Sequence, residues 1–324
     1  MNETIYNSVL ELTGAKSLTK IEEIQSLWSG YGSISRYSLQ SASIDSIIIK
    51  QIQLNKMKSH PRGWGNQVGH QRKIKSYQVE CSWYQDYNQS KNQNFRTAKC
   101  YGILGGDPET FILLEDLDAA GYPVRITHPS WASFCACIKW LASFHAYHLQ
   151  VKPISLWEIG TYWHLQTRPE ELKQLKDIPL KKAAYTIDQI LNNSTYKTLV
   201  HGDAKIANFC FSESCDQVAA VDFQYIGAGC GMKDLAYFTG SCMQEIDAEK
   251  KEASILNYYF DCFREESSLD SKEINFLEKE WRSLYSVAWV DFQRFLKGWC
   301  PDHWKINQYS DKLQMELLRR ISNQ

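Results

Sequence analysis

The sequence predicts an α+β protein with a strand-rich N-terminal lobe, residues 1–116, and a mainly helical C-terminal lobe, residues 117–324. Two observations lead to this prediction. Short alternating or β-branched apolar runs are concentrated before residue 115, whereas long stretches with apolar residues at helical spacing dominate after residue 130. A regular alternation of strands and helices is absent, which argues against a doubly wound parallel sheet.

The first element expected along the chain is a helix. Residues 18–27 carry apolar side chains at helical spacing, and Thr19 with Glu22 three residues later has the form of a capping box. A turn rich in glycine and serine follows at residues 28–36. We therefore expect one helix before the sheet begins.

The next elements are expected to be strands, followed by a loop. Alternating residues around Tyr37 and Leu39 predict one strand. The short β-branched run at residues 46–52 predicts a buried strand that carries Lys50 near its end. The polar segment 55–70 contains proline and several glycines, so we expect a loop there, with the hypothesis that it folds over a site as a lid.

Beyond that loop, one helix and two strands complete the N-terminal lobe. Residues 75–87 have the apolar spacing of a helix that carries Glu80. Residues 99–104 and 110–114 predict two strands joined by a Gly-Gly-Asp-Pro turn. Residues 115–120 then lead into the helical lobe.

The C-terminal lobe is expected to be helical apart from two short strands. Residues 131–149 and 274–321 have helical periodicity. The short apolar runs at 198–200 and 218–221 each end at a polar residue, and such strand ends often carry functional groups. Several aromatic residues of the last helices have helical spacing and are expected to pack in the core: Trp281, Tyr285, Trp289 and Phe292.

Composition and charge exclude several classes of protein. The chain has 324 residues, a hydrophobic fraction of 44% and a formal net charge of -1, so neither global disorder nor bulk attraction to nucleic acid is expected. No apolar stretch is long enough for a membrane span, and the first residues lack the pattern of a secretory signal. The 10 cysteines form no C-x-x-C pair, so we expect reduced thiols in a cytoplasmic protein.

One set of polar residues suits phosphoryl transfer. Asp203 and Asn208 follow the first short strand with Lys205 between them, and Asp222 follows the second. Such a reaction needs a carboxylate to accept the proton of the attacking hydroxyl, hard oxygen ligands for Mg²⁺, and a cation near the transferred group. Asp203 fits the first role, Asn208 and Asp222 fit the second, and Lys50 and Lys205 fit the third.

The segment from His201 to Asn208 resembles the H-G-D-x-x-x-x-N motif of aminoglycoside phosphotransferases, choline and ethanolamine kinases, and ecdysteroid-kinase-like proteins. The run Asp222-Phe223-Gln224 resembles their metal-binding segment. The resemblance covers roughly residues 18–240 and implies a two-lobed protein-kinase-like fold with an antiparallel sheet in the N-terminal lobe. It also implies an enzyme that uses ATP and Mg²⁺ to phosphorylate a hydroxyl group of a small molecule.

The same resemblance implies roles for residues of the N-terminal lobe. Lys50 would contact the α- and β-phosphates of ATP, and Glu80 would pair with it. Gly30, Gly32 and Ser33 would lie over the phosphates, where small side chains let backbone N–H groups approach.

The remaining implied roles concern the base, the metal and the adenine. The backbone around Glu115 and Leu117 would bind adenine. Asp203 would be the catalytic base and Lys205 would contact the γ-phosphate. The metal ligands would be Asn208 and Asp222. His201 is expected to anchor the catalytic loop structurally, and Asp234 is expected to be either a helix N-terminal residue or a residue that braces a loop.

Alternatives for the function remain open at this point. A kinase-like protein could hold nucleotide for regulation without turnover, although Lys50, Asp203, Asn208 and Asp222 are all present. A protein kinase is disfavoured because no A-P-E segment follows Asp222. The acceptor could be a choline- or ethanolamine-like molecule, an aminoglycoside or a lipophilic alcohol, with no nucleic-acid partner.

Overall fold

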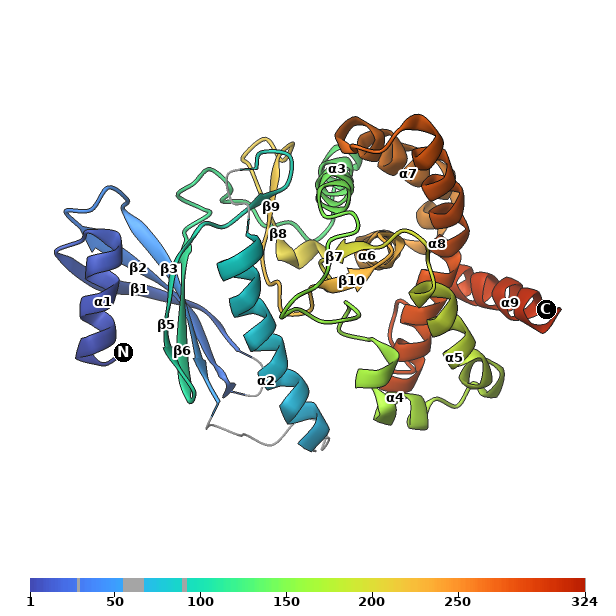
Figure 1. Ribbon diagram of the computed structural model, residues 1–324, viewed down its shortest axis with the longest axis horizontal. Helices are drawn as coiled ribbons and strands as arrows, with labels where there is room; N and C mark the ends of the chain where they lie inside the picture. The colour runs from blue at the N-terminus through green and yellow to red at the C-terminus, as the bar shows by residue number, and fades with distance from the viewer. Residues whose placement is uncertain (28–29, 55–66, 89–91, 324) are drawn as a thin grey trace. The chain divides into compact units, whose positions relative to one another are not determined.

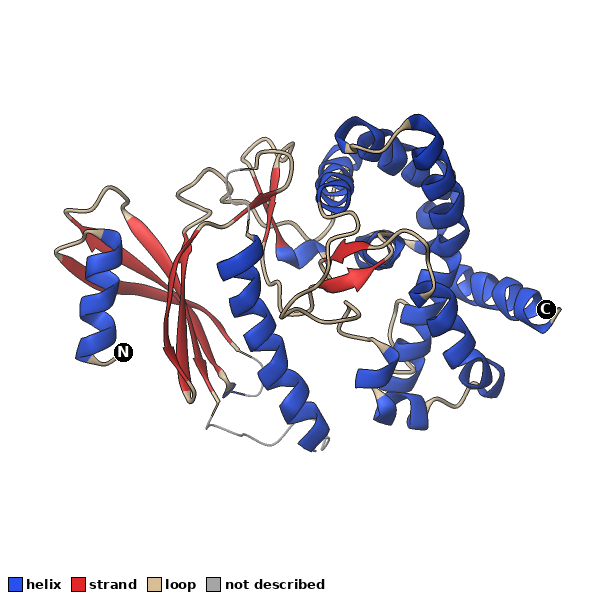
Figure 2. Cartoon of the chain, in the orientation of Figure 1, coloured by secondary structure: helices blue, strands red, loops and turns tan. Residues whose placement is uncertain are grey.

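A computed structural model describes residues 1–27, 30–54, 67–88 and 92–323. The chain divides into two compact units. The first unit comprises Met1–Val124 and Cys210–Val221, and the second comprises Arg125–Phe209 and Asp222–Gln324. Figure 2 shows a large sheet in the first unit and mainly helices in the second, so the expected α+β class is confirmed.

The first unit is built on a five-stranded antiparallel sheet with the strand order β1-β2-β3-β6-β5. Its strands are β1 (Ser17–Ser26), β2 (Gly32–Gln40), β3 (Ser46–Gln53), β5 (Cys100–Gly106) and β6 (Glu109–Glu115). Its helices are α1 (Glu3–Thr13), α2 (Gln67–Ser82) and a π-helical turn, η2 (Trp83–Tyr87). A second, smaller sheet has the order β4-β9-β8, with bounds Arg96–Thr97, Val218–Ala220 and Phe209–Phe211.

Helices α1 and α2 cover opposite faces of the large sheet (Figure 1). Val9 of α1 packs in one hydrophobic cluster with Ile47 and Ile49 of β3. Because successive side chains of a strand point to opposite faces, Lys50 points away from α1 and meets Glu80 of α2. The sheet therefore presents an apolar core to one helix and a charged group to the other.

Residues 18–27 form strand β1, so the helix expected there is wrong. The pairing of β1 with β2 has register shifts between Lys20 and Glu22 and between Glu23 and Gln25. Each bulge displaces the alternation of side chains by one position, so the apolar residues recur about every third residue and imitate helical spacing. The strand is also largely exposed at the sheet edge, which removes the usual inside–outside pattern.

The other elements expected in this unit mostly agree with the structure. The helix predicted at 75–87 is present but begins earlier, because α2 starts at Gln67. The loop predicted at 55–70 is therefore wrong for residues 67–70, where α2 has begun. Residues 55–66, and with them the lid hypothesis, lie outside the described residues.

The second unit consists mainly of helices around a two-stranded antiparallel sheet of β7 (Thr198–Val200) and β10 (Gly227–Gly229). Its α-helices are α3 (Trp131–Tyr147), α4 (Pro169–Gln174), α5 (Ile178–Asn192), α6 (Met232–Cys242), α7 (Glu245–Glu266), α8 (Ser271–Trp299) and α9 (Gln308–Ser322). Two 3₁₀ turns are η3 (Leu165–Thr167) and η4 (Ile206–Asn208). No helix among the described residues is long and apolar enough to span a bilayer.

The core of the second unit is rich in aromatic side chains. Helix α3 is buried along most of its length. Trp281, Tyr285, Trp289 and Phe292 of α8 are all buried, as their spacing predicts. This packed body supports β7 and β10, and the loops that follow these short strands carry the polar residues of interest.

Candidate functional site

The loop after β7 is shaped by a glycine at position 202. Gly202 has a positive φ of 79°, and a Cβ there would lie 2.1 Å from the carbonyl oxygen of Tyr225. No other residue fits this position without moving the backbone. The loop therefore turns sharply at Gly202 and continues into Asp203.

Asp234 holds the backbone of this turn in place. Its carboxylate is fully buried and accepts hydrogen bonds from the backbone N–H groups of His201, at 2.5 Å, and Gly202, at 2.9 Å. His145 lies against the same carboxylate, with its Nε2 at 3.1 Å. The ring of His201 accepts a hydrogen bond from the N–H of Asp203 at 3.3 Å, which supports a structural role for this histidine.

The carboxylate of Asp203 is surrounded by hydrogen-bond donors. Tyr237 donates to Oδ1 at 3.0 Å, while Lys205, at 2.9 Å, and Asn208, at 3.2 Å, donate to Oδ2. Burial, helped by the charge of Asp203, raises the pKa of Tyr237 well above its ordinary value, so its hydroxyl keeps the proton that it donates. Asp203 is thus an oriented carboxylate with only 6% of its surface exposed.

Asn208 and Asp222 each carry a side-chain oxygen of the type that binds Mg²⁺. The Nδ2 of Asn208 donates to the carbonyl oxygen of Asp203 at 2.8 Å, and its Oδ1 accepts no hydrogen bond from the described residues. Asp222 has a positive φ of 70° and accepts from Gln224 at 2.7 Å through Oδ1. Oxygen donors of this kind, completed by water and phosphate oxygens, are what Mg²⁺ prefers.

Lys205 lies between the negative groups of this loop. Burial alone would lower the pKa of its ammonium, but the carboxylates of Asp203 and Asp222 outweigh that effect and raise it. Lys205 therefore remains a cation at neutral pH. The second unit thus brings together Asp203, Lys205, Asn208 and Asp222, as their spacing in the sequence suggests.

The expected pair of Lys50 and Glu80 is formed within the first unit. The ammonium of Lys50 lies 2.8 and 2.7 Å from the two carboxylate oxygens of Glu80. Both side chains are almost fully buried. The ammonium also lies 5.8 Å from the ring centroid of Tyr77. A buried pair of this geometry fixes the direction of the lysine side chain.

The glycine-rich turn belongs to the hairpin between β1 and β2. Gly30 has a positive φ of 76°. At Gly32, a Cβ would lie 1.9 Å from the carbonyl oxygen of Gln51, so close packing on β3 requires glycine there. Ser33 pairs with Ser26 and Gln51 in the sheet. The hairpin explains these residues structurally, and their contact with phosphates stays a prediction.

The segment expected to bind adenine begins at the last residue of β6. The carboxylate of Glu115 accepts hydrogen bonds from Arg96 and from the backbone N–H of Lys99. The backbone N–H of Glu115 donates to the carbonyl oxygen of Lys99 at 2.8 Å. The carbonyl of Leu117 accepts from Tyr122 at 2.8 Å. The Leu117 N–H has no hydrogen-bond partner among the described residues, which leaves it available to an acceptor atom of a base.

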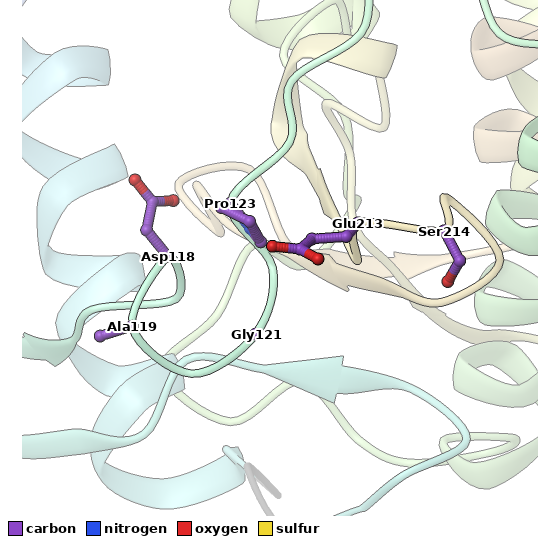
Figure 3. Close-up of a pocket in the computed structure, with 6 residues that line it drawn as sticks. All are labelled: Asp118, Ala119, Gly121, Pro123, Glu213 and Ser214. Carbon is purple, nitrogen blue, oxygen red and sulfur yellow. The ribbon is translucent and has the colours of Figure 1, made fainter.

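A pocket of about 680 Å³ lies elsewhere in the first unit (Figure 3). Its lining residues are Asp118, Ala119, Gly121, Pro123, Glu213 and Ser214. None of the predicted site residues lines it, and Asp118 is paired with Arg36. We therefore do not assign the site to this pocket.

The sequence alone did not identify Tyr237 or His145 as parts of the site. Tyr237 lies three residues after Asp234 on α6, so both side chains point to the same side of the helix. That spacing is common in helices and carries no functional signal by itself. His145 comes from α3, 89 residues away from Asp234. Only the fold brings them together.

Comparisons with known proteins agree with this geometry. Residues 155–270, which include the loop of Asp203 and Asp222, match the model of the ecdysteroid kinase-like family. A search of curated proteins finds no match.

Two solved structures resemble the chain as a whole. The amicoumacin kinase hAmiN, in complex with AMP-PNP, Ca²⁺ and Ami, has a TM-score of 0.54 at 13% identity, over 99% of this chain and 92% of that one. An ethanolamine kinase of Plasmodium vivax has a TM-score of 0.52 at 14% identity, over 97% and 88%. The expected resemblance and the kinase-like fold are confirmed, and an enzyme of the small-molecule kinase class agrees with them.

Proposed function

We propose that this protein transfers the γ-phosphoryl group of ATP to a hydroxyl group of a small molecule. The observation that carries the proposal is the setting of Asp203, a carboxylate oriented by Tyr237, Lys205 and Asn208. Asp222 completes the set of oxygen donors beside it. The family match over residues 155–270 supports the same reaction class.

In this reaction the acceptor oxygen attacks the γ-phosphorus while its proton passes to Asp203. The bond between the γ-phosphorus and the bridging oxygen breaks, and ADP leaves with that oxygen. Lys205 offsets negative charge on the transferred group. Mg²⁺ held by Asn208 and Asp222 would supply further charge neutralisation at the phosphates.

The nucleotide would be held by groups of the first unit. Lys50, kept in place by Glu80, would contact the α- and β-phosphates. The N–H of Leu117 would donate to the adenine, because it has no partner among the described residues. Gly30, Gly32 and Ser33 would approach the phosphates through their backbone.

The test measures ADP release from MgATP with a panel of hydroxyl acceptors. In Asp203→Ala we expect turnover to fall by roughly 10²–10⁴-fold, which is typical of the loss of a general base, while MgATP still raises the melting temperature. In Asp222→Ala we expect the Mg²⁺-dependent shift of the melting temperature to disappear. Asp261→Ala, at an exposed position of α7, is the matched control and should behave as wild type.

Two other results would redirect the assignment. If Asp203→Ala turned over like wild type, Asp203 would not be the base. If MgATP bound through Asp222 but no acceptor stimulated ADP release, the protein would be a nucleotide-binding regulator.

A further inference from the structure

Lys305 lies in the loop between α8 and α9 with its backbone held on both sides. Its N–H donates to Nδ1 of His303 at 3.2 Å. Its carbonyl oxygen accepts from Gln293 at 3.0 Å and from Ser310 at 3.3 Å. The loop therefore fixes the point from which the lysine side chain extends.

The ammonium of Lys305 is surrounded by aromatic faces. It lies 5.1 Å from the ring centroid of Tyr237, and 5.6 Å from those of Phe292 and Trp304. We call these three rings the aromatic box. The ammonium has no hydrogen-bond or ion-pair partner among the described residues, although an ammonium carries three N–H donors.

The aromatic box adjoins the candidate base. The hydroxyl of Tyr237, one wall of the box, donates to Oδ1 of Asp203 at 3.0 Å. Burial lowers the pKa of Lys305 to about 8, and the charge of Asp203 acts against that effect, so the lysine is mainly protonated at neutral pH. An acceptor whose hydroxyl reaches Asp203 must therefore come close to a positive charge.

Rings arranged in this way usually bind a cation of the ligand, such as a quaternary ammonium. Here the protein's own ammonium occupies that place. A cationic acceptor would meet repulsion and find the rings already engaged. An acceptor with an oxygen next to the reacting hydroxyl would instead give the unpaired donors of Lys305 a partner.

We propose that Lys305 is a specificity-determining residue that excludes cationic acceptors and binds an oxygen of a neutral or anionic alcohol. The proposal rests on the proposed function and narrows its substrate class. It disfavours choline-like and aminoglycoside-like acceptors among those that the sequence leaves open. Lys305 acts on the acceptor, and transfer itself remains with Asp203.

A binding experiment tests the box without requiring turnover. Tetramethylammonium chloride is titrated into the full chain at constant ionic strength, with tryptophan fluorescence as the readout. We expect no saturable binding of tetramethylammonium to wild type or to Lys305→Arg. Lys305→Ala, whose aromatic box is empty, should bind it with an affinity at least roughly tenfold above the detection limit set by wild type. Equal affinity in wild type and Lys305→Ala, or no binding to either, would overturn the proposal.

A kinetic experiment tests the effect on selectivity. Choline is compared with its neutral isostere, in which a carbon atom replaces the nitrogen, and glucosamine is compared with glucose and glucuronate. In wild type we expect kcat/KM to be lower by about tenfold or more for each cationic member. Lys305→Ala should narrow that ratio, Lys305→Arg should keep it, and Lys312→Ala, at an exposed position of α9, should leave it unchanged.

The two experiments separate the two proposals. A ratio that is the same in wild type and Lys305→Ala would remove Lys305 as a selector and leave the kinase in place. ADP release that never exceeds that of Asp203→Ala would remove the proposed function, and the tetramethylammonium titration would still decide whether Lys305 blocks the box.

Discussion

Replacing Asp234 by asparagine should loosen the loop that carries Asp203. The carboxylate of Asp234 accepts from two backbone N–H groups, those of His201 and Gly202, and is fully buried. Asparagine has the same shape but only one oxygen. One of the two backbone N–H donors must then face an NH₂ group, which is itself a donor and cannot accept the hydrogen bond.

The expected cost follows from those contacts. Loss of a hydrogen bond to a charged acceptor costs about 1.5–3 kcal/mol, and an unsatisfied buried N–H costs about 1–3 kcal/mol. Because these two penalties overlap, we expect the free energy of unfolding to fall by about 2–4 kcal/mol. For a unit of this size the melting temperature should fall by roughly 5–15 °C.

Thermal unfolding and turnover together test this prediction. Displacement of Asp203 should also lower kcat, on the order of tenfold to hundredfold, with little change in nucleotide binding. Asp261→Asn, the same exchange at an exposed position in the same unit, should change neither quantity. If Asp234→Asn melted within about 1 °C of wild type and kept its kcat, the bracing argument would be refuted.

Two further predictions concern buried ionisable groups. Lys50→Met leaves the carboxylate of Glu80 buried without its lysine, so we expect a loss of about 3–5 kcal/mol in urea unfolding, partly recovered in Lys50→Met/Glu80→Leu. As a control, Lys20→Met removes the exposed ion pair with Glu23 and should lower the free energy of unfolding by less than about 1 kcal/mol. If Lys50→Met/Glu80→Leu were no more stable than Lys50→Met, the argument would be contradicted. Burial lowers the pKa of His148 to about 4, from an ordinary value of 6.5. Between these two pH values the unfolded chain binds more protons than the folded chain. The free energy of unfolding therefore falls as the pH is lowered from 6.5 to 4. This loss should reach about 3 kcal/mol in wild type and be absent in His148→Gln. If wild type and His148→Gln had the same urea midpoint at every pH, the predicted effect of His148 would be excluded.

The sequence predicts the second unit's polar loop well because its residues are close together in the chain. Asp203, Lys205 and Asn208 span six positions, and Asp222 follows the next short strand. Local spacing therefore limits how far apart their side chains can lie. The pair of Lys50 and Glu80 is also identified, because the β-branched run at 46–52 predicts the strand of Lys50 and the segment 75–87 predicts the helix of Glu80.

What the sequence does not predict depends on distant contacts or on irregular geometry. His145 reaches Asp234 only through the packing of α3, and Lys305 enters the aromatic box only through the loop after α8. The prediction for residues 18–27 is wrong for a local reason, because the bulges of β1 change the spacing of its apolar residues from two to about three. Helix α1 is missing from the expected elements although the chain carries its end signals, Asn2 as N-cap and the left-handed Gly14 after its last turn.

The irregular shape of β1 has a consequence for the behaviour of the protein at high concentration. β1 is an outer strand of the large sheet, and a regular outer strand offers a template on which a neighbouring chain can add a strand. The two bulges interrupt the row of backbone donors and acceptors, and Lys20, Glu22 and Glu23 place charges along it. The geometry that disguises the strand in the sequence therefore also protects the sheet against edge-to-edge aggregation.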